Sequence, residues 1–523
     1  MNLITNLYKL LKAPLEKHFY FFITVLLLHA LVDVVFFYIY WRFSLQVLLN
    51  GLFLSYLLTL PCMWLARHKR IFRFYKVLVF VPYIISFVAD IVAHAVLDSS
   101  LDEDVAATIL ATNKDEFVEC VETYFSFLPL GIGVVILFVA YKLYKYLQTT
   151  TPKYVFMWMT GVVAGGLMTL TADPTAWGGV LGKAVIFYRA QSPIDLHTYN
   201  HVLDLKVDSV SQPQNIVMII GESLTKFHCS SYGYEKRTTP RLEELIDNGL
   251  LYQFENVKSP EVHTLPVFKT LFSQYRCEWE DSVRWYTCPT LQSVLHASGY
   301  KTTWVSNQSK RGVCDNFIGS YAELCTENYF AGNKLAGMKR KTHDEVVVDL
   351  LKPLVQQDTL HNFYVVHLMG SHFKFAKRYP KEFDHYQMSD YPELPFSQQK
   401  VVATYDNSVL YNDSVVSEVM RLFENKEAIV FYFSDHAIDL YQSSSSYYGH
   451  AKKTKESFKW GQEIPFYIYM TPKYQDRFPE VVTAVKNHQQ TNFCTDNMFY
   501  TIMDLIGADF VGNDNVKRYS LFE

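Results

Sequence analysis

The chain has 523 residues, which exceeds one typical domain and predicts at least two structural units. Its 48 basic and 52 acidic residues give a net charge of -4, and no basic face is evident, which argues against a nucleic-acid partner. Long apolar and aromatic runs crowd residues 19–172, whereas residues 213–523 alternate short apolar runs with charged stretches. The composition therefore predicts a membrane part followed by a soluble part.

Five apolar runs in the first third of the chain are long enough to cross a hydrocarbon core, which takes about 20 mostly apolar residues. They are residues 19–41, 44–65, 72–97, 123–146 and 154–172. The first run is too long for a cleaved signal peptide, and no small-residue cleavage site follows it. We therefore predict an α-helical transmembrane domain of five spans over residues 1–172.

Basic residues predict the orientation of these spans. They flank the first span, the connection from the second to the third and the connection from the fourth to the fifth, as Lys9, Lys12, Lys17, residues 67–76, Lys142, Lys145 and Lys153. The positive-inside rule assigns these stretches to the cytoplasm, and the acidic loop of residues 97–122 then lies outside. Because the number of spans is odd, everything after residue 172 is expected outside the cytoplasm.

Four of the eight cysteines form two close pairs in the exported part, Cys277 with Cys288 and Cys314 with Cys325. In an oxidising compartment such spacing suits local disulfides, although the sequence fixes no connectivity and free thiols remain the alternative. A zinc site built from these four is disfavoured because the chain has no CxxC spacing among them.

Residues 173–212 mix glycine, proline and amphipathic stretches, so we expect a linker that lies along the membrane surface. Beyond it, short apolar runs alternate with helical patterns such as residues 238–249, which have Thr and Pro at the start and Gly249 at the end. The runs expected as strands are residues 215–220, 301–306, 362–368, 428–434 and 464–470. This alternation predicts an α/β domain over residues 213–523, with a largely parallel central sheet covered by helices on both faces.

Polar residues follow four of these expected strands: Glu222, Asn307, His372, and the neighbours Asp435 and His436. Ligands of such sheets bind beyond the carboxyl ends of the strands, so one site could collect these side chains. Glu222, Asp435 and His436 supply two carboxylates and an imidazole, a ligand set that suits zinc or a similar divalent ion. The alternative is that each residue only ends its strand.

Thr264 stands ahead of an apolar helical pattern in residues 259–274. A hydroxyl at a helix N-terminus is well placed to receive an anionic group, because free N–H groups and the helix dipole point there. A metal nearby would help such a hydroxyl to lose its proton. From the spacing alone, a plain helix N-cap is the simpler interpretation.

Four stretches occur in a characteristic order: "NIVMIIGESLTKFHCSSYGYEKRTTPRL" (215–242), "YVVHLMGSHFKFAKRYP" (364–380), "YDNSVLYND" (405–413) and "FYFSDH" (431–436). Together they resemble the membrane-anchored phosphoethanolamine transferases of the alkaline-phosphatase and sulfatase superfamily. Five spans ahead of an exported α/β domain also match this family, so the resemblance covers nearly the whole chain.

The resemblance implies a zinc-dependent enzyme of the bacterial inner membrane, with its catalytic domain in the periplasm. It would transfer phosphoethanolamine from phosphatidylethanolamine to a lipopolysaccharide acceptor, either lipid A or a core sugar. Glu222, Asp435, His436 and Thr264 would bind the zinc, and Thr264 would be the nucleophile that carries the transferred group. The added ethanolammonium would reduce negative surface charge, and weaker binding of cationic peptides such as polymyxin would follow.

Further residues of the site are carried over from the same resemblance. His372 and His450 would contact the phosphoryl group and could bind a second zinc ion. Thr112 and Glu116, in the stretch "TILATNKDE" of the outer loop, would hold the ethanolamine end of the donor, since a carboxylate suits an ammonium. The family has one phosphate-contacting lysine where this chain has Lys310 followed by Arg311, so either could meet the phosphate.

The chain departs from the family after "SDH", where Ala437 and Ile438 replace the usual Gly-Glu and leave the acceptor open. Alternatives within the superfamily are a glycerol-phosphate transferase, a phosphatase or a sulfatase. A sulfatase needs a Cys or Ser that is converted to formylglycine, which Thr264 cannot supply, and Glu116 favours a cationic donor. A catalytically dead membrane sensor is the alternative from another class.

Overall fold

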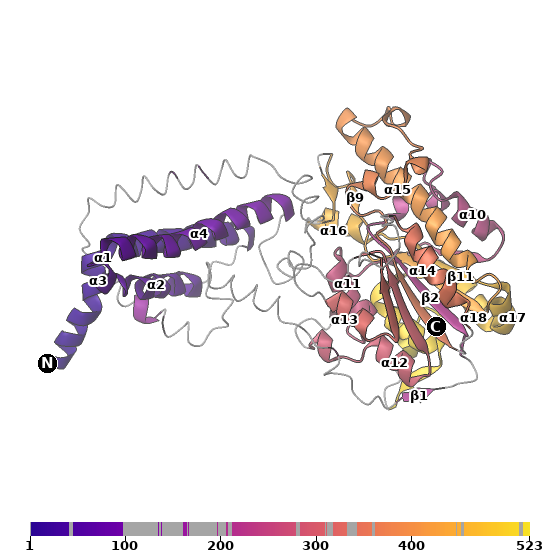
Figure 1. Cartoon of the computed structure of the whole chain (residues 1–523), viewed down its shortest axis with the longest axis horizontal. Coiled ribbons are helices and arrows are strands. Elements are labelled where there is room, and N and C mark those ends of the chain that lie inside the picture. Colours follow the sequence, from indigo (N-terminus) through magenta and orange to yellow (C-terminus); the bar gives the residue numbers. More distant parts are fainter. Residues whose placement is uncertain are drawn as a thin grey trace. The chain divides into compact units, whose positions relative to one another are not determined.

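The computed structural model describes two compact units (Figure 1): Met1–Leu110 with Cys120–Ser192, and Ala111–Glu119 with Pro193–Glu523. The described residues are 2–40, 45–97, 134, 138, 161–164, 166, 196, 205–207, 212–278, 283–308, 310, 317–331, 343–357, 361–445, 447–450, 454–511 and 516–523.

The first unit is helical where it is described. Its helices are α1 (Asn2–Tyr40), α2 (Leu45–Thr59), α3 (Cys62–Leu65) and α4 (Lys69–Leu97), and α1 contacts the other three. Phe21 and Val25 of α1 pack with Val79 and Tyr83 of α4 in one buried cluster. Apolar packing between these helices therefore holds the unit together.

The first three predicted spans fall on α1, α2 and α4. Within the described part of the chain, no helix combines the length and the apolar character that crossing a membrane requires. The spans at residues 19–41, 44–65 and 72–97 stay predictions. The spans predicted at 123–146 and 154–172 lie almost entirely outside the described residues.

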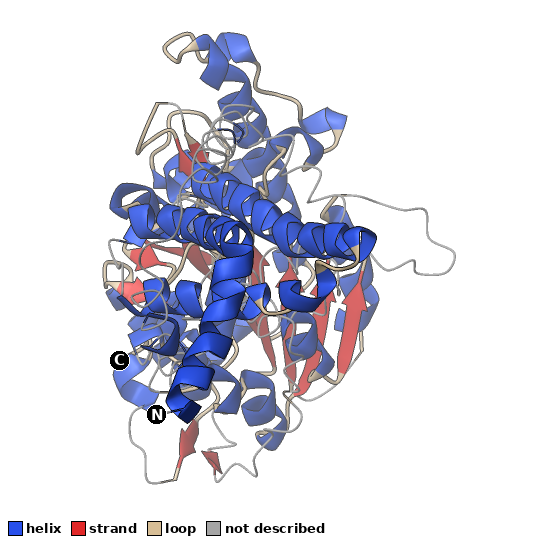
Figure 2. Cartoon of the chain, turned by 90° about the vertical axis from the view of Figure 1, so that its left-hand side faces the viewer, coloured by secondary structure: helices blue, strands red, loops and turns tan. Residues whose placement is uncertain are grey.

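The second unit is built on a seven-stranded sheet with the order β3-β11-β8-β2-β7-β5-β6, whose strands are red in Figure 2. The strands are β2 (Asn215–Gly221), β3 (Leu251–Phe254), β5 (Lys301–Ser306), β6 (Glu327–Phe330), β7 (Asn362–His367), β8 (Ala428–Ser434) and β11 (Phe466–Met470). All five expected strands are present. Four neighbouring pairs of strands are parallel, as the predicted largely parallel sheet requires, and β11 pairs antiparallel with both β3 and β8, which makes the sheet mixed.

Helices cover both faces of this sheet (Figure 1). They are α10 (Pro240–Asp247), α11 (Thr264–Leu271), α12 (Leu291–Ala297), α13 (Phe317–Glu323), α14 (Glu345–Val355), α15 (Phe396–Arg421), α16 (Lys455–Gln462), α17 (Pro472–Arg477), α18 (Pro479–His488), α19 (Met498–Leu505) and α20 (Val516–Tyr519). Val217 packs with α14 and α15 on one face, whereas Phe268 of α11 lies against Trp304 on the other. The α/β architecture predicted from the sequence is therefore confirmed.

Shorter elements border the sheet. Single-turn 3-10 helices are η2 (Lys226–His228), η3 (Ser230–Tyr232), η5 (Trp285–Thr287), η6 (Phe375–Lys377), η7 (Lys381–Phe383), η8 (Met388–Asp390) and η9 (Thr495–Asn497). Two-stranded pairs join β1 (Leu205–Val207) to β13 (Ala508–Phe510), β4 (Val257–Lys258) to β12 (Phe493–Cys494), and β9 (Asp439–Leu440) to β10 (Tyr448–Gly449).

The predicted disulfides are absent among the cysteines that the structure describes. Cys277, Cys288 and Cys325 are free thiols. The thiol of Cys288 points to the Arg284 carbonyl oxygen at 3.8 Å, and that of Cys325 points to the Tyr321 carbonyl oxygen at 3.7 Å. Cys314 lies outside the described residues.

The register of the sheet brings the ends of four strands level. Gly221 of β2 pairs with Ser434 of β8, and His367 of β7 pairs with Ile220 on one side and Ser306 on the other. Side chains that follow these strands therefore meet at one edge of the sheet, as the sequence predicts.

Candidate metal centre

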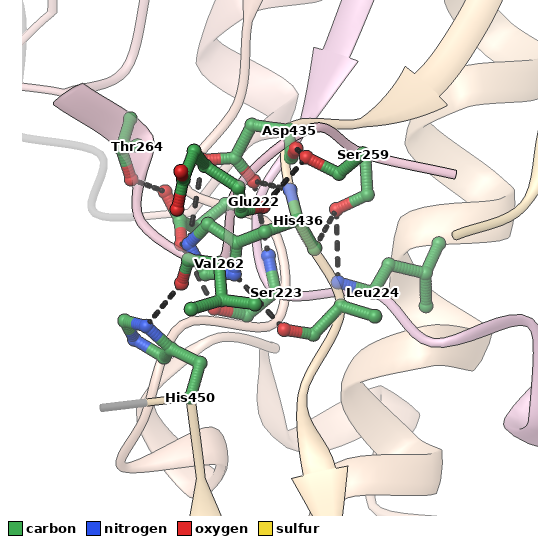
Figure 3. A network of polar contacts seen from close by, with 12 residues as sticks. Glu222, Ser223, Leu224, Ser259, Val262, Thr264, Asp435, His436 and His450 are labelled. Atoms are coloured by element: carbon green, nitrogen blue, oxygen red, sulfur yellow. Dashed lines mark hydrogen bonds and ion pairs between the residues drawn. The ribbon is translucent and has the colours of Figure 1, made fainter. Parts of the chain in front are cut away.

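Glu222, Asp435 and His436 converge at this edge (Figure 3), and their ligand atoms all lie within 4.8 Å of one another. Glu222 follows β2, and the other two follow β8. The Nε2 atom of His436 lies 3.2 Å from Oε1 of Glu222 and 3.5 Å from Oδ2 of Asp435. All three side chains are almost fully buried. The structure thus brings together the three residues that the sequence predicts as metal ligands.

The polar atoms of this cluster fit a metal ion. Within the described chain, Oδ2 of Asp435 and Nε2 of His436 are buried and have no hydrogen-bond partner. The other ring nitrogen of His436, Nδ1, lies 2.9 Å from the Ala437 carbonyl oxygen, to which it can only donate. This contact leaves Nε2 facing the two carboxylates, where it can bind a metal once its proton is lost, and zinc-binding histidines are oriented in this way.

Backbone groups fix the carboxylates. Asp435 accepts from the His436 amide at 2.7 Å and from the Ser223 amide at 3.4 Å, both through Oδ1. Ser223 has a positive φ of 56°, which is uncommon for a residue with a side chain, and its hydroxyl donates to Oε1 of Glu222 at 2.8 Å. The turn after β2 is therefore a constrained one that aims both carboxylates at the same point.

Thr264 is the first residue of α11, and its hydroxyl donates to Oε2 of Glu222 at 3.3 Å. The N-cap position belongs to His263, whose side chain makes no capping hydrogen bond. The simpler N-cap interpretation of Thr264 is thus wrong, because the helix starts one residue earlier than that role requires. Thr264 is only partly buried, whereas Glu222, the carboxylate partner of its hydroxyl, is almost fully buried.

The charges of the cluster are strongly coupled. Burial raises the pKa of Asp435, and the Glu222 charge adds to this, giving about 7. Burial alone would lower the pKa of His436, but Asp435 and Glu222 raise it to about 9. Burial would raise the pKa of Glu222, yet the His436 charge holds it well below the usual value. Without a metal, the site therefore retains a proton near neutral pH, and a bound cation would replace it.

Three more histidines surround the cluster. The ring centroid of His450 lies 4.2 Å from that of His436 and 5.3 Å from that of His263. Its Nδ1 lies 2.8 Å from the Val262 carbonyl oxygen. Burial and the His436 charge lower the pKa of His450 well below its ordinary value. His372, in the loop after β7, is close enough for its charge to lower the pKa of Glu222.

Four further residues were predicted to contact the substrate, and the structure describes only one of them, Lys310. The amino group of Lys310 lies 3.1 Å from Oε1 of Glu323 and 3.4 Å from Oδ1 of Asn328. Thr112, Glu116 and Arg311 lie outside the described residues.

Asn307 follows β5 but does not contact the cluster; its side chain donates to Asp344 at 2.8 Å. The next residue, Gln308, contacts the cluster instead. Nε2 of Gln308 lies 3.3 Å from Oε2 of Glu222 and 3.0 Å from the Leu368 carbonyl oxygen. The position of Gln308 directly after a strand was a usable signal, but the sequence does not tell which of two neighbouring amides points inward.

Ala437 and Ile438, the departure from the family motif, are both buried. The Ala437 amide donates to the Gly461 carbonyl oxygen at 2.7 Å, at the end of α16. A side chain at Gly461 would come within 2.7 Å of Val262. These close contacts pack α16 directly against the segments that carry His436 and Thr264.

Fold and site together are those of an α/β protein with a candidate metal centre at one edge of its central sheet. Residues 214–508 match the Sulfatase family, and because this is more than half of the chain, the protein belongs to that family.

Among curated proteins, phosphoethanolamine transferase EptC of Escherichia coli strain K12 is 25% identical over 321 residues, which are 60% of this chain and 54% of that protein. The Kdo(2)-lipid A phosphoethanolamine 7''-transferase of the same organism is 25% identical over 330 residues, 59% of this chain and 54% of that protein. The chain spans about half the length of these curated relatives. The resemblance to phosphoethanolamine transferases inferred from the motifs is thus confirmed.

Solved structures agree. The C-terminal periplasmic domain of EptC from Escherichia coli in complex with Zn has a TM-score of 0.54 at 25% identity, covering 61% of this chain and 89% of that one. The integral membrane protein lipooligosaccharide phosphoethanolamine transferase A from Neisseria meningitidis has a TM-score of 0.59 at 16% identity, covering 94% of this chain and 98% of that one. The second likeness concerns the fold alone and extends it over nearly the whole chain.

Proposed function

We propose that the chain is a zinc-dependent phosphoethanolamine transferase that moves phosphoethanolamine from phosphatidylethanolamine to a lipopolysaccharide acceptor. The observation that carries this proposal is the hydroxyl of the partly buried Thr264, which lies 3.3 Å from a carboxylate of a buried three-residue candidate metal cluster. The names of the relatives, which include two phosphoethanolamine transferases, support the group transferred.

Glu222, Asp435 and His436 would hold the zinc ion, with Thr264 beside them. When bound, zinc would supply a positive charge that favours the ionised hydroxyl and neutralises negative charge on the phosphoryl group. The Thr264 hydroxyl already donates to Oε2 of Glu222, so its proton has an acceptor in place. The free N–H groups at the start of α11 and the helix dipole would favour the anionic phosphate there.

The transfer has two balanced steps. In the first, Oγ1 of Thr264 forms a bond to the donor phosphorus, the bond to the diacylglycerol oxygen breaks, and that oxygen takes up a proton. His372 and His450 are proposed to contact the phosphoryl group, and the proton that Thr264 gives to Glu222 balances the one that the diacylglycerol oxygen takes up. In the second step, an acceptor oxygen forms the new bond to phosphorus and loses its proton, while Oγ1 of Thr264 leaves and regains one.

We further propose an inner-membrane location, with residues 1–172 spanning the membrane, residues 173–212 as linker and the catalytic part, residues 213–523, in the periplasm. The integral membrane relative and the periplasmic domain named above support this organisation. Thr112 and Glu116 are proposed to hold the ethanolamine end of the donor, and Lys310 or Arg311 to contact its phosphate. One zinc ion is proposed, with room for a second during turnover.

The test uses membranes that contain the full chain and phosphatidylethanolamine labelled in its headgroup. We expect label on Thr264 and release of diacylglycerol, both lost in Thr264→Ala and retained in part in Thr264→Ser. Thr483→Ala, which changes an exposed threonine on α18, is the matched control and should behave as the wild type. Undiminished diacylglycerol release by Thr264→Ala would exclude the covalent step.

The alternatives give different outcomes in the same assay. Labelled phosphatidylglycerol as the better donor would indicate a glycerol-phosphate transferase, and release of free phosphoethanolamine to water would indicate a hydrolase. Failure to label combined with failure to bind zinc would indicate an inactive domain. Mass spectrometry of lipopolysaccharide from cells with and without the gene identifies whether lipid A or a core sugar is modified.

A further inference from the structure

Asp344 lies directly before α14 and is 3% exposed. An aspartate at this position usually caps its helix, but the side chain of Asp344 makes no capping hydrogen bond. It binds two loops at the edge of the sheet instead. Oδ1 accepts from the Asn307 amide group at 2.8 Å and from the Met369 backbone amide at 2.9 Å, and Oδ2 accepts from the Gly370 backbone amide at 2.8 Å.

Asp344 binds the loop after β7, and this loop packs closely against the backbone of Glu222 in the candidate metal cluster. Gly370 has a positive φ of 52°, and a side chain there would come within 2.7 Å of the Glu222 amide nitrogen and 2.8 Å of its carbonyl oxygen. The next residue, Ser371, donates its backbone amide to the Glu222 carbonyl oxygen at 2.9 Å. The backbone of Glu222 is therefore held by a turn whose own backbone amides donate hydrogen bonds to Asp344.

The loop after β5 holds the carboxylate of the same residue. Asn307 is tied to Asp344, and its neighbour Gln308 donates to Oε2 of Glu222 at 3.3 Å. Because Thr264 donates to the same oxygen, a shift of this loop would move the partner of the nucleophile. One buried carboxylate thus joins the two loops that fix the main chain and the side chain of Glu222.

We propose that Asp344 is a positioning residue for the metal centre: it holds the loops after β5 and β7 together so that Glu222 keeps the orientation required to bind zinc and to accept from Thr264. The inference rests on the proposed metal site but not on the identity of the transferred group. Partners one shell removed from a metal typically contribute 10–100-fold to metal affinity or activity.

The test compares two isosteric changes in the full chain. Asp344→Asn replaces the acceptor facing Gly370 with a donor. Asp413→Asn is the matched control, because Asp413 is equally buried and accepts from the Arg241 and Leu242 amides at 3.1 and 2.9 Å, at the start of α10. Zinc affinity is measured with Zn²⁺ alone, in competition with a chelating dye, and thermal stability is recorded for both variants.

We expect Asp344→Asn to weaken zinc binding by about 10-fold or more. The same change should lower kcat, with a smaller effect on the KM for the donor. Asp413→Asn should lower the melting temperature but leave the zinc affinity unchanged. Equal zinc affinity in both variants would overturn the positioning role. If Asp344→Asn does not fold, Asn307→Ala takes its place, because it removes only one of the three donors to Asp344. Its zinc affinity is then compared with that of Asp413→Asn in the same way. Absence of zinc binding by the wild type would instead refute the proposed metal site.

Discussion

The two oxygens of the Glu222 carboxylate have different partners: Oε2 accepts from the Thr264 hydroxyl at 3.3 Å, and Oε1 lies 3.2 Å from Nε2 of His436. One side chain therefore joins the candidate nucleophile to the candidate metal ligands. A change at Glu222 should disconnect the two parts of the site, even where the fold is retained.

Glu222→Gln keeps the size of the side chain but removes its charge. We expect zinc binding to weaken by about 10-fold or more and labelling of Thr264 to fall by at least as much, because a ligand is lost and the hydroxyl loses its anionic acceptor. Chelator competition and headgroup labelling measure the two effects. Glu244→Gln, an exposed change on α10, is the control. Normal labelling with Glu222→Gln would show that this carboxylate is not part of the reaction.

Tyr405→Phe tests the turn that carries Glu222. The Tyr405 hydroxyl donates to the Ser223 carbonyl oxygen at 2.9 Å and accepts from the Thr225 amide at 3.0 Å, at a fully buried position. Its removal leaves two buried backbone groups without this partner, which costs roughly 1–3 kcal/mol. We expect a lower melting temperature together with slower transfer, since Ser223 holds an uncommon backbone conformation.

Tyr329→Phe is the matched control for that change. The Tyr329 hydroxyl makes only a long contact to Glu327, at 3.4 Å, on the edge strand β6. Its loss should leave both stability and transfer within the range of the wild type. If the two tyrosine variants behaved alike, the turn after β2 would not depend on Tyr405.

The sequence predicts the centre of the site well because each ligand directly follows a strongly apolar strand. The runs at 215–220 and 428–434 match β2 and β8 within one residue, so Glu222, Asp435 and His436 could be expected at one edge. The expected helix at 238–249 likewise contains α10, and Gly249 beyond its end has a positive φ of 68°. Local patterns suffice where a residue lies next to a strand end.

The rest depends on contacts that the sequence does not show. No local pattern distinguishes a parallel from an antiparallel strand in a covered sheet, so the direction of β11 could not be predicted. β3 and β6 have only four residues each and were missed. Asp344 lies 37 positions from Asn307 in the chain, and only the packing of α14 against the sheet brings them together. Positioning residues of this kind carry no signal in a single sequence.

The metal-free protein should lose stability as the pH rises from about 6.5 to about 9. The pKa of His436 is raised to about 9 in the folded state, so its stabilising contribution is complete below the unfolded value of 6.5 and is lost as the pH passes through 9. The pKa of Asp435 is raised from 3.8 to about 7, so its contribution also falls with rising pH, but mostly below this range, between about pH 4 and pH 7. Thermal melts in the presence of a chelator measure the effect.

Zinc should remove this dependence, because the loaded site no longer binds the extra proton. Binding must displace the proton of His436, so affinity is expected to rise by about tenfold per pH unit up to about pH 9, provided that one proton is released. The difference in melting temperature between zinc-loaded and metal-free protein then widens with pH. His385→Gln, an exposed histidine remote from the cluster in sequence, should leave both curves unchanged. A pH-independent zinc affinity would contradict the shared proton.

Ile438→Glu restores the carboxylate that related transferases usually have after "SDH", and we expect it to be poorly tolerated. Ile438 is 1% exposed and belongs to the apolar cluster that includes Leu440 and Val402. A glutamate there would place a charge among apolar side chains, which costs about 3 kcal/mol or more unless the group is protonated or the segment moves. Ile438→Leu, which keeps the apolar character, should cost less than about 1.5 kcal/mol. Denaturant unfolding measures both, and a fully stable Ile438→Glu protein would mean that the loop after His436 can turn this side chain outward, toward the acceptor.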